Sequence, residues 1–241
     1  MFARPIMVGG FAALCFAATD ARAQNPWLVE EGPEAFVLPA RTGAFEIGAG
    51  FGYTQPVGAV SSVQNIGDMV DEGIGVSLDL GYRINPWWSL ATAFHFHESQ
   101  GDDTFVEGVD VRGLVSGLQA TYHVLPFRAA DPYLTFGAGY RFLWIVPPGA
   151  EPTRVLHGFQ AAKVIGGIDF RFNDMVALGP AVGADLDLLL WDDMDVPNAS
   201  GAIEDPRPTA FVFAGLAGRF DVGGRAESEE SRAKELARAS R

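Results

Sequence analysis

Residues 73–97 have the sequence GIGVSLDLGYRINPWWSLATAFHFH, in which large apolar residues alternate with small or polar ones on both sides of Asn85-Pro86-Trp87. Successive side chains of a β-strand point to opposite faces, so a period of two gives each strand one large apolar face and one small or polar face. Asparagine and proline between two such segments indicate a tight turn. The stretch therefore predicts two antiparallel strands.

The same period of two occurs eight times along the chain. The predicted strands cover approximately residues 44–54, 73–84, 88–97, 111–124, 133–146, 156–172, 175–191 and 209–220. In the last segment, Phe211 and Phe213 interrupt the alternation because they are large residues on the otherwise small face. No apolar run after residue 23 approaches the ~20 residues that a membrane-spanning helix needs. The apolar residues are therefore distributed among strands.

The connections between these strands alternate in length. Long loops are expected at residues 55–72, 98–110, 147–155 and 192–208, and shorter turns at 85–87, 125–132 and 173–174. Long and short connections on an even number of strands are typical of outer-membrane barrels, in which the short turns are periplasmic and the long loops extracellular. The sequence therefore predicts an all-β fold, an eight-stranded antiparallel transmembrane β-barrel.

The first 23 residues have the features of a secretory signal peptide. Arg4 supplies a positive charge, residues 6–18 are apolar, and Ala21-Arg22-Ala23 is a cleavage motif. A lipoprotein alternative would use Cys15, but Leu14 occupies a position where a small residue is expected. We expect a signal peptide (1–23), a periplasmic lead-in (24–43), the barrel (44–221) and a charged tail (222–241).

The composition excludes several classes of protein. The 241 residues carry a net charge of −13, which argues against binding to the phosphates of nucleic acid. The only cysteine lies within the predicted signal peptide, so a disulfide framework is not expected in the mature chain.

The small face of the strands indicates which side points inward. A soluble lipocalin-like barrel would place the apolar face inside and expose a face rich in Lys, Glu, Thr and Gln to water. Here the second face is mostly Gly, Ala and Ser with isolated charges, which suits a narrow lumen. The predicted lumen network of opposite charges is Glu46, Asp79, Asp169, Asp185 and Asp187 with Arg83, Arg141, Lys163, Arg171 and Arg219.

Aromatic residues gather at the strand ends on the opposite face. Membrane barrels carry such rings at both membrane–water interfaces. The predicted periplasmic girdle is Phe45, Tyr82, Trp88, Tyr122, Phe172 and Phe220, and the predicted outer girdle is Tyr53, Phe96 and Trp144.

With this layout, residues 44–221 resemble the small outer-membrane β-barrel superfamily of OmpA-like and OmpW-like proteins. Residues 215–220 (GLAGRF) also resemble the C-terminal signal read by the barrel-assembly machinery, although Gly218 replaces a usual hydrophobic residue and the chain continues beyond it. The resemblance implies an outer-membrane location, with that machinery and outer-membrane lipids, including lipopolysaccharide, as partners. The tail is too short for the peptidoglycan-binding domain that follows some family barrels.

Two histidine motifs could in principle carry chemistry. His95 and His97 share one face of a strand, as a metal site would require, and His123 could complete it, but a polar histidine pair in the lumen is favoured. His97-Glu98-Ser99 resembles the His-x-Ser motif of lipid A deacylases, but the strand parity directs both side chains to the lumen. We therefore expect no catalytic residue, no metal site and no cofactor.

The predicted loops are acidic. Asp192-Asp193-Met194-Asp195 could bind Ca²⁺ or Mg²⁺ through carboxylate oxygens, but solvated loops are favoured. The leading hypothesis is a non-enzymatic structural or surface-interaction barrel. The alternative is a narrow channel for small or apolar solutes, and a remote alternative is a lipid A-modifying hydrolase. The solute, the surface partner and the oligomeric state stay open.

Overall fold

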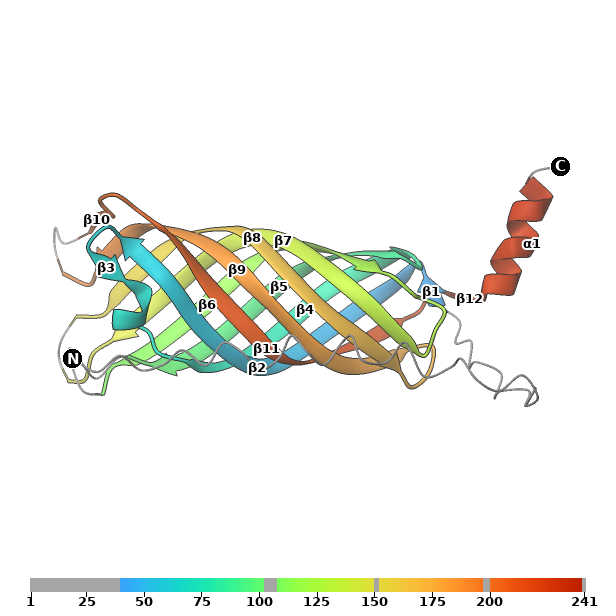
Figure 1. The fold of residues 1–241 in the computed structure, drawn as a ribbon, viewed down its shortest axis with the longest axis horizontal. Coiled ribbons are helices and arrows are strands. Elements are labelled where there is room, and N and C mark those ends of the chain that lie inside the picture. Colours follow the sequence, from blue (N-terminus) through green and yellow to red (C-terminus); the bar gives the residue numbers. More distant parts are fainter. Residues whose placement is uncertain (1–39, 102–107, 150–151, 197–199, 240–241) are drawn as a thin grey trace, which may run out of the picture. The chain divides into compact units, whose positions relative to one another are not determined.

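The structure, a computed structural model, describes residues 40–101, 108–149, 152–196 and 200–239 (Figure 1). Within these ranges, eight long strands form one antiparallel sheet: β2 (Ala44–Ser61), β4 (Gly73–Asn85), β5 (Trp88–Gln100), β6 (Asp110–His123), β7 (Ala130–Val146), β8 (Arg154–Arg171), β9 (Val176–Met194) and β11 (Pro208–Val222). Each strand pairs with the next, and β11 pairs with both β9 and β2. The sheet therefore closes into an eight-stranded barrel, as the sequence predicts.

The connections give the barrel a turn end and a loop end. At the turn end, the Oδ1 atom of Asn85 accepts hydrogen bonds from the backbone N–H groups of Trp87 (2.9 Å) and Trp88 (3.0 Å). Asn173 does the same for Met175 and Val176, both at 2.8 Å. An asparagine side chain can thus replace a backbone acceptor in a tight turn, which explains why these two connections are short.

Smaller elements extend the two ends. At the loop end, β3 (Gln64–Asn65) pairs with β2, a 3-10 helix, η1 (Ile66–Asp68), follows, and β10 (Gly201–Ala202) pairs with β9. At the turn end, β1 (Ala40–Thr42) pairs with β12 (Arg225–Glu227), and helix α1 (Glu229–Ala239) follows. In the described part of the chain, no helix has both the length and the apolar character needed to cross a membrane.

Several strands continue beyond their predicted ends at the loop end. The sequence predicts that this strand ends at Thr54, and the Pro56 and Gly58 that follow interrupt strands in most contexts. The ladder instead continues from Thr54 to Gly58 against residues 209–213 of β11. Gly58 permits this because it adopts a φ of +105°, which a residue with a side chain rarely reaches. Tertiary pairing therefore overrides the local signal.

Side chains divide between the two faces of the wall. Large apolar residues such as Leu80, Phe136 and Leu186 are exposed on the outer surface, whereas the charged residues of the small face are buried inside. Phe211 and Phe213 lie on the same parity as Thr209 and Arg219, so they follow the strand pattern and point inward. Phe211 therefore departs from the sequence pattern only in the size of its side chain, because it places a large ring in the lumen where the other inward residues are small or polar.

Some sequence expectations lie outside the described residues. These are the signal peptide, the lead-in up to residue 39, and the acidic positions Asp102, Asp103 and Glu107 of the second long loop.

Candidate functional site in the barrel interior

A group of charged side chains fills the turn end of the lumen. We call it the turn-end ionic cluster; it comprises Glu46, Arg83, Asp131, Asp169, Arg171, Arg219 and Asp221. The members come from β2, β4, β7, β8 and β11, so the cluster joins strands on all sides of the barrel. A lumen of eight strands has room for little more than side chains, and these groups occupy it across its width.

Arg83 and Arg219 organise this cluster. Arg219 forms ion pairs with Glu46 (Nη1–Oε1, 3.1 Å) and Asp169 (Nε–Oδ2, 2.9 Å), and its guanidinium lies 4.2 Å from the ring centroid of Tyr133. Arg83 is 1% exposed and donates a hydrogen bond of 2.9 Å to the carbonyl oxygen of Pro86. Buried charges are tolerated only when they are paired in this way.

Arg83 also lies between three carboxylates. Its N–O distances are 3.5 Å to Asp221, 3.8 Å to Glu46 and 3.9 Å to Asp131. Asp131 is shared further, because it lies 3.5 Å from Arg171. The group is therefore one connected network rather than a set of separate pairs.

The lumen network predicted from the sequence leaves out three residues of this region. Asp131, Asp221 and His123 lie at or just beyond the predicted strand ends, and His123 Nδ1 lies 2.8 Å from Asp131 Oδ2. The alternation of inward and outward side chains along each strand could have identified them. Asp131 continues the inward series of Tyr133 in β7, and Asp221 continues that of Arg219 in β11.

A second ionic group lies nearer to the loop end. Arg141 is fully buried and forms ion pairs with Asp185 (2.9 Å) and Asp187 (3.0 Å) of β9. The Arg141 guanidinium carbon lies 3.8 Å from the ring centroid of Phe211 in β11. One cation from β7 thus contacts both the carboxylates of β9 and the ring of Phe211, which is the cross-strand partner of Asp185 in the adjacent strand β11.

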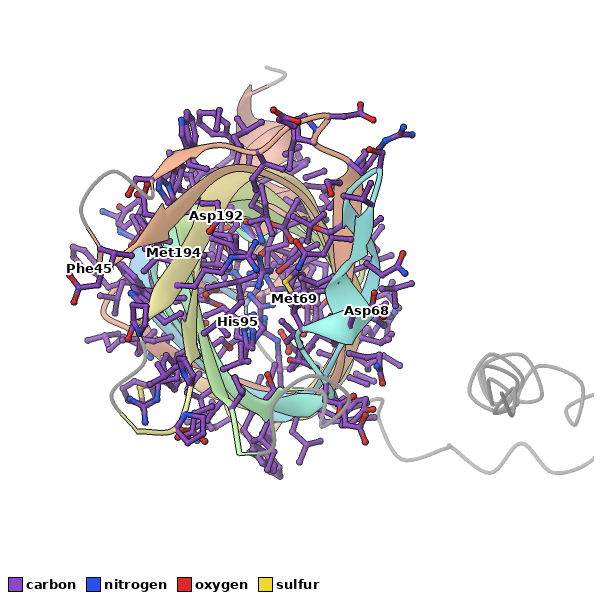
Figure 2. The ribbon with its side chains drawn as sticks, turned by 90° about the vertical axis from the view of Figure 1, so that its left-hand side faces the viewer. Phe45, Asp68, Met69, His95, Asp192 and Met194 are labelled. Atoms are coloured by element: carbon purple, nitrogen blue, oxygen red, sulfur yellow. The ribbon has the colours of Figure 1, made fainter. Side chains whose placement is uncertain are left out.

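The loop end of the lumen is closed by an apolar plug. It consists of Val60, Ile66, Val70, Val111, Leu143, Leu156, Leu189 and Phe211, and Met69 packs against it. Ile66, Met69 and Val70 come from η1 and the segment after it, so the first long loop folds back into the mouth of the barrel. Figure 2 looks into this end and shows Met69 and His95 inside the ring of strands, whereas Phe45 points outward.

An ion pair borders the apolar plug. Arg154 binds both carboxylate oxygens of Asp192, with donor–acceptor distances of 2.8 and 2.7 Å, and also donates to Gln64. Another carboxylate of the last loop, Asp205, accepts a hydrogen bond from Arg207, and this bond lowers the pKa of the Asp205 carboxyl. Two of the acidic loop residues therefore already have arginine partners.

A small cavity lies between the two ionic groups. Its volume is about 40 Å³, and its polar lining includes Asp79, His95, Gln119, Lys163, Asp185 and Arg219. Buried polar atoms on Asp79 (Oδ1), His95 (Nε2) and Gln119 (Oε1) have no hydrogen-bond partner among the described residues. Unsatisfied polar groups around a void of this size favour a few ordered waters.

All ten residues proposed for the lumen network lie on the inner face. Glu46, Arg83, Asp169, Arg171 and Arg219 meet in the turn-end ionic cluster, and Arg141, Asp185 and Asp187 meet in the second group. Asp79 hydrogen-bonds with Gln119, and Lys163 lies opposite Asp185 in the β8–β9 register. The structure thus divides eight of the ten residues between two groups, and the other two, Asp79 and Lys163, line the cavity between them.

The proposed girdle residues lie on the outer surface. Phe45, Tyr53, Tyr82, Trp88, Phe96, Phe172 and Phe220 are exposed, and Tyr122 and Trp144 are partly exposed. Two cross-strand pairs stand out at the turn end: Phe45 with Tyr82 (5.7 Å between centroids) and Trp88 with Tyr122 (5.0 Å). Their role at a membrane interface stays a prediction.

The structure does not bring His123 together with His95 and His97. His95 and His97 are buried in the lumen with 6.1 Å between ring centroids, while His123 contacts Asp131 in the turn-end region. Within the described residues, His, Cys, Asp and Glu side chains form no group of three that could hold a metal ion. His97 and Ser99 both point inward, where the chain of a membrane lipid does not reach.

Comparison with known proteins gives a family and several similar structures. Residues 11–179 match the family described as "Outer membrane protein beta-barrel domain". No curated protein sequence matches significantly. Neisserial surface protein A has 15% identity, with a TM-score of 0.48 over 73% of this chain and 96% of its own. OprG from Pseudomonas aeruginosa has 16% identity, with a TM-score of 0.49 over 76% of this chain and 99% of its own.

Proposed function

Since the chain belongs to the outer membrane protein β-barrel domain family and therefore lies in the outer membrane, we propose that it is a closed, non-enzymatic barrel that strengthens the membrane and presents its loops for surface contacts. The observation that carries this proposal is the filling of the lumen at both ends. The turn-end ionic cluster blocks one end and the apolar plug blocks the other.

The two blocks resist opening for different physical reasons. A solute passing the turn end would have to separate Arg83 and Arg219 from their carboxylates, and an unpaired buried charge is costly. A solute passing the loop end would have to displace packed apolar side chains from the mouth. The void between them, at about 40 Å³, has room for roughly three waters. This arrangement favours a structural role over conduction.

The orientation follows from the lengths of the connections. We propose that the turn end faces the periplasm and that the loops face the exterior, with lipopolysaccharide around the outer half of the wall. The signal-like residues 215–220 lie in β11, the strand that closes the barrel against β2, which suits recognition by the barrel-assembly machinery. The acidic loops then form the surface available to other molecules.

Conductance of the purified, refolded full chain in planar lipid bilayers tests this function. The closed lumen predicts no current steps, while a general porin added to the same bilayers shows that recording works. The double variant Arg83→Ala/Phe211→Ala removes one side chain from each end and should be the first to conduct. Arg207→Ala, which changes an exposed loop, is the matched control and should remain silent.

The narrow-channel alternative has one observation in its favour. The cavity around His95, Asp79 and Gln119 contains polar atoms without partners, as a wetted path would. The apolar plug would then have to move with the first loop, through Ile66, Met69 and Val70. Regular current steps from the wild-type chain would support this channel and overturn the closed-barrel proposal.

The structural role has a separate readout in cells. Cells that lack the protein should become more sensitive to detergents, and the wild-type chain should restore their resistance. An unchanged sensitivity would argue against a contribution to membrane strength.

A further inference from the structure

Four rings form a parallel stack on the outer surface of β7, β8 and β9. We call Trp144, Phe142, His157 and Trp191 the outer ring stack. Successive rings lie 5.7, 5.6 and 5.4 Å apart between centroids, with interplanar angles of 18°, 21° and 18°. An aromatic residue at a membrane interface needs no ring partner, so four successive stacked rings that include a histidine suggest a more specific role.

The histidine is held on both sides by hydrogen bonds. Its Nε2 lies 3.0 Å from Asp193 Oδ2, and its Nδ1 lies 2.6 Å from the Tyr140 hydroxyl. A carboxylate only accepts, so His157 Nε2 carries the hydrogen and Nδ1 accepts from Tyr140. Both ring nitrogens are therefore used, and the imidazole plane is fixed between Phe142 and Trp191.

The outer ring stack lies beyond the hydrocarbon layer in the proposed orientation. His157 precedes Arg171, at the turn end of β8, by about 14 residues. At about 3.3 Å per residue and a tilt near 40°, it stands roughly 35 Å from the turn end, whereas the apolar band of such barrels is about 25 Å tall. The stack is therefore at the level of the outer-leaflet headgroups, which in this membrane are sugars and phosphates.

Trp191 ends the stack, where the rings of Tyr140 and Phe159 from β7 and β8 also contact it, and it is open on the side away from these strands. Its side chain is 36% exposed, and its cross-strand neighbour on the open side is the small Ala202 of β10. Asp193 lies two residues further along β9 on the same side, and its side chain is 48% exposed. An open indole face beside a carboxylate is complementary to a pyranose, which offers an apolar C–H face and hydroxyl donors.

The charge around the stack favours the sugar over the phosphate. The Asp193 carboxylate lies beside it, whereas the cation Arg154 lies on the inner face of the wall, where it is bound to both oxygens of Asp192. An anionic group approaching Trp191 would meet the Asp193 carboxylate and no free cation beside it among these residues, so a neutral sugar ring is the better ligand.

We propose that Trp191 and Asp193 bind a pyranose unit of an outer-leaflet glycolipid, with Trp191 stacking on the ring and Asp193 accepting hydrogen bonds from its hydroxyls. His157 and Tyr140 are positioning residues that hold Asp193 and the indole in place. This inference rests on the proposed orientation, which places the loop end outside the cell.

Binding of fluorophore-labelled rough lipopolysaccharide, which carries a full core oligosaccharide, to the full chain in detergent micelles tests the proposal by fluorescence polarisation. Trp191→Leu and Asp193→Ala should each bind about tenfold more weakly, the equivalent of one lost contact of about 1.4 kcal/mol. Trp191→Tyr keeps a ring that can stack and should restore most of the binding. Trp88→Leu is the matched control, because Trp88 is also an exposed, ring-paired tryptophan but lies at the turn end.

Two further binding measurements identify which chemical group of the glycolipid is bound. Lipopolysaccharide stripped of phosphate should bind as well as the intact molecule, whereas loss of binding on dephosphorylation would overturn the sugar assignment. The soluble core oligosaccharide should bind more weakly, and equal binding would replace the glycolipid by a soluble glycan. Folding of each variant is verified by circular dichroism. If the folded Trp191 and Asp193 variants bind with the affinity of the wild type, the proposed sugar site is also wrong.

The experiments distinguish an error in the sugar site from an error in the proposed orientation. If a label at Ser200 is accessible on intact cells but the Trp191 variants bind normally, only the sugar site is wrong. If the label is not accessible, the orientation itself is wrong.

Discussion

His97 lies in the lumen against a glycine of the neighbouring strand. It pairs directly with Gly113 of β6, and a Cβ atom built on Gly113 would overlap the imidazole ring. Tyr133 lies in the same way over its cross-strand partner Gly167 in β8. Large inward side chains thus fit a narrow lumen because the adjacent strand has none at that position.

The first prediction concerns this fit. Gly113→Ala should lower the free energy of unfolding in lipid by about 1–3 kcal/mol, because an overpacked interior must displace His97 or the backbone. Urea titration of the refolded protein in bilayers measures the loss. Gly201→Ala is the control, since a Cβ at Gly201 meets nothing within 4 Å. Equal losses from both variants would contradict the account.

The second prediction concerns Arg141. Arg141→Ala leaves Asp185 and Asp187 buried without their cation and should cost about 3–5 kcal/mol of unfolding free energy. Arg207→Ala breaks an exposed ion pair and should cost at most about 1 kcal/mol. The same urea titration compares them, and a small loss for Arg141→Ala would mean that the second ionic group contributes little to stability.

At the scale of the strand, the alternation of residues was sufficient to predict all eight strands and the inward side of each. The ends of strands were less predictable, because β2 passes through Pro56 and Gly58 only when β11 is paired beside it. The apolar plug was not predicted, since Val60, Ile66 and Val70 lie in a segment without any period of two. Their burial depends on the loop folding back, which is a tertiary effect.

The third prediction tests the outer face of the strands. Leu80 and Leu186 are exposed near the middle of β4 and β9, where an arginine facing lipid should cost about 2–4 kcal/mol. Leu80→Arg and Leu186→Arg should therefore reduce stability in bilayers by that amount, measured by equilibrium unfolding. Asp79→Asn, the inward neighbour, should cost less because the amide keeps part of the hydrogen bonding. The reverse order would mean that the two faces had been interchanged.

At the scale of the whole molecule, the absence of cysteine after Cys15 provides a clean test of topology. Ser200 lies in the last long loop and Arg128 in the β6–β7 turn, and both are exposed. A membrane-impermeant maleimide added to intact cells should label Ser200→Cys and leave Arg128→Cys unlabelled until the cells are opened. Labelling of both on intact cells would be inconsistent with the proposed orientation.

The seam between β2 and β11 joins residues far apart in the chain, with Phe45 opposite Val222. This contact can form only after the last strand has been synthesised, so until then the edge of β2 that faces away from β4 has unpaired backbone N–H and C=O groups. Open strand edges promote aggregation in water and are not tolerated in hydrocarbon. Nascent chains must therefore be kept apart in the periplasm until closure, and a chain truncated before β11 should be cleared by proteases rather than accumulate in the membrane.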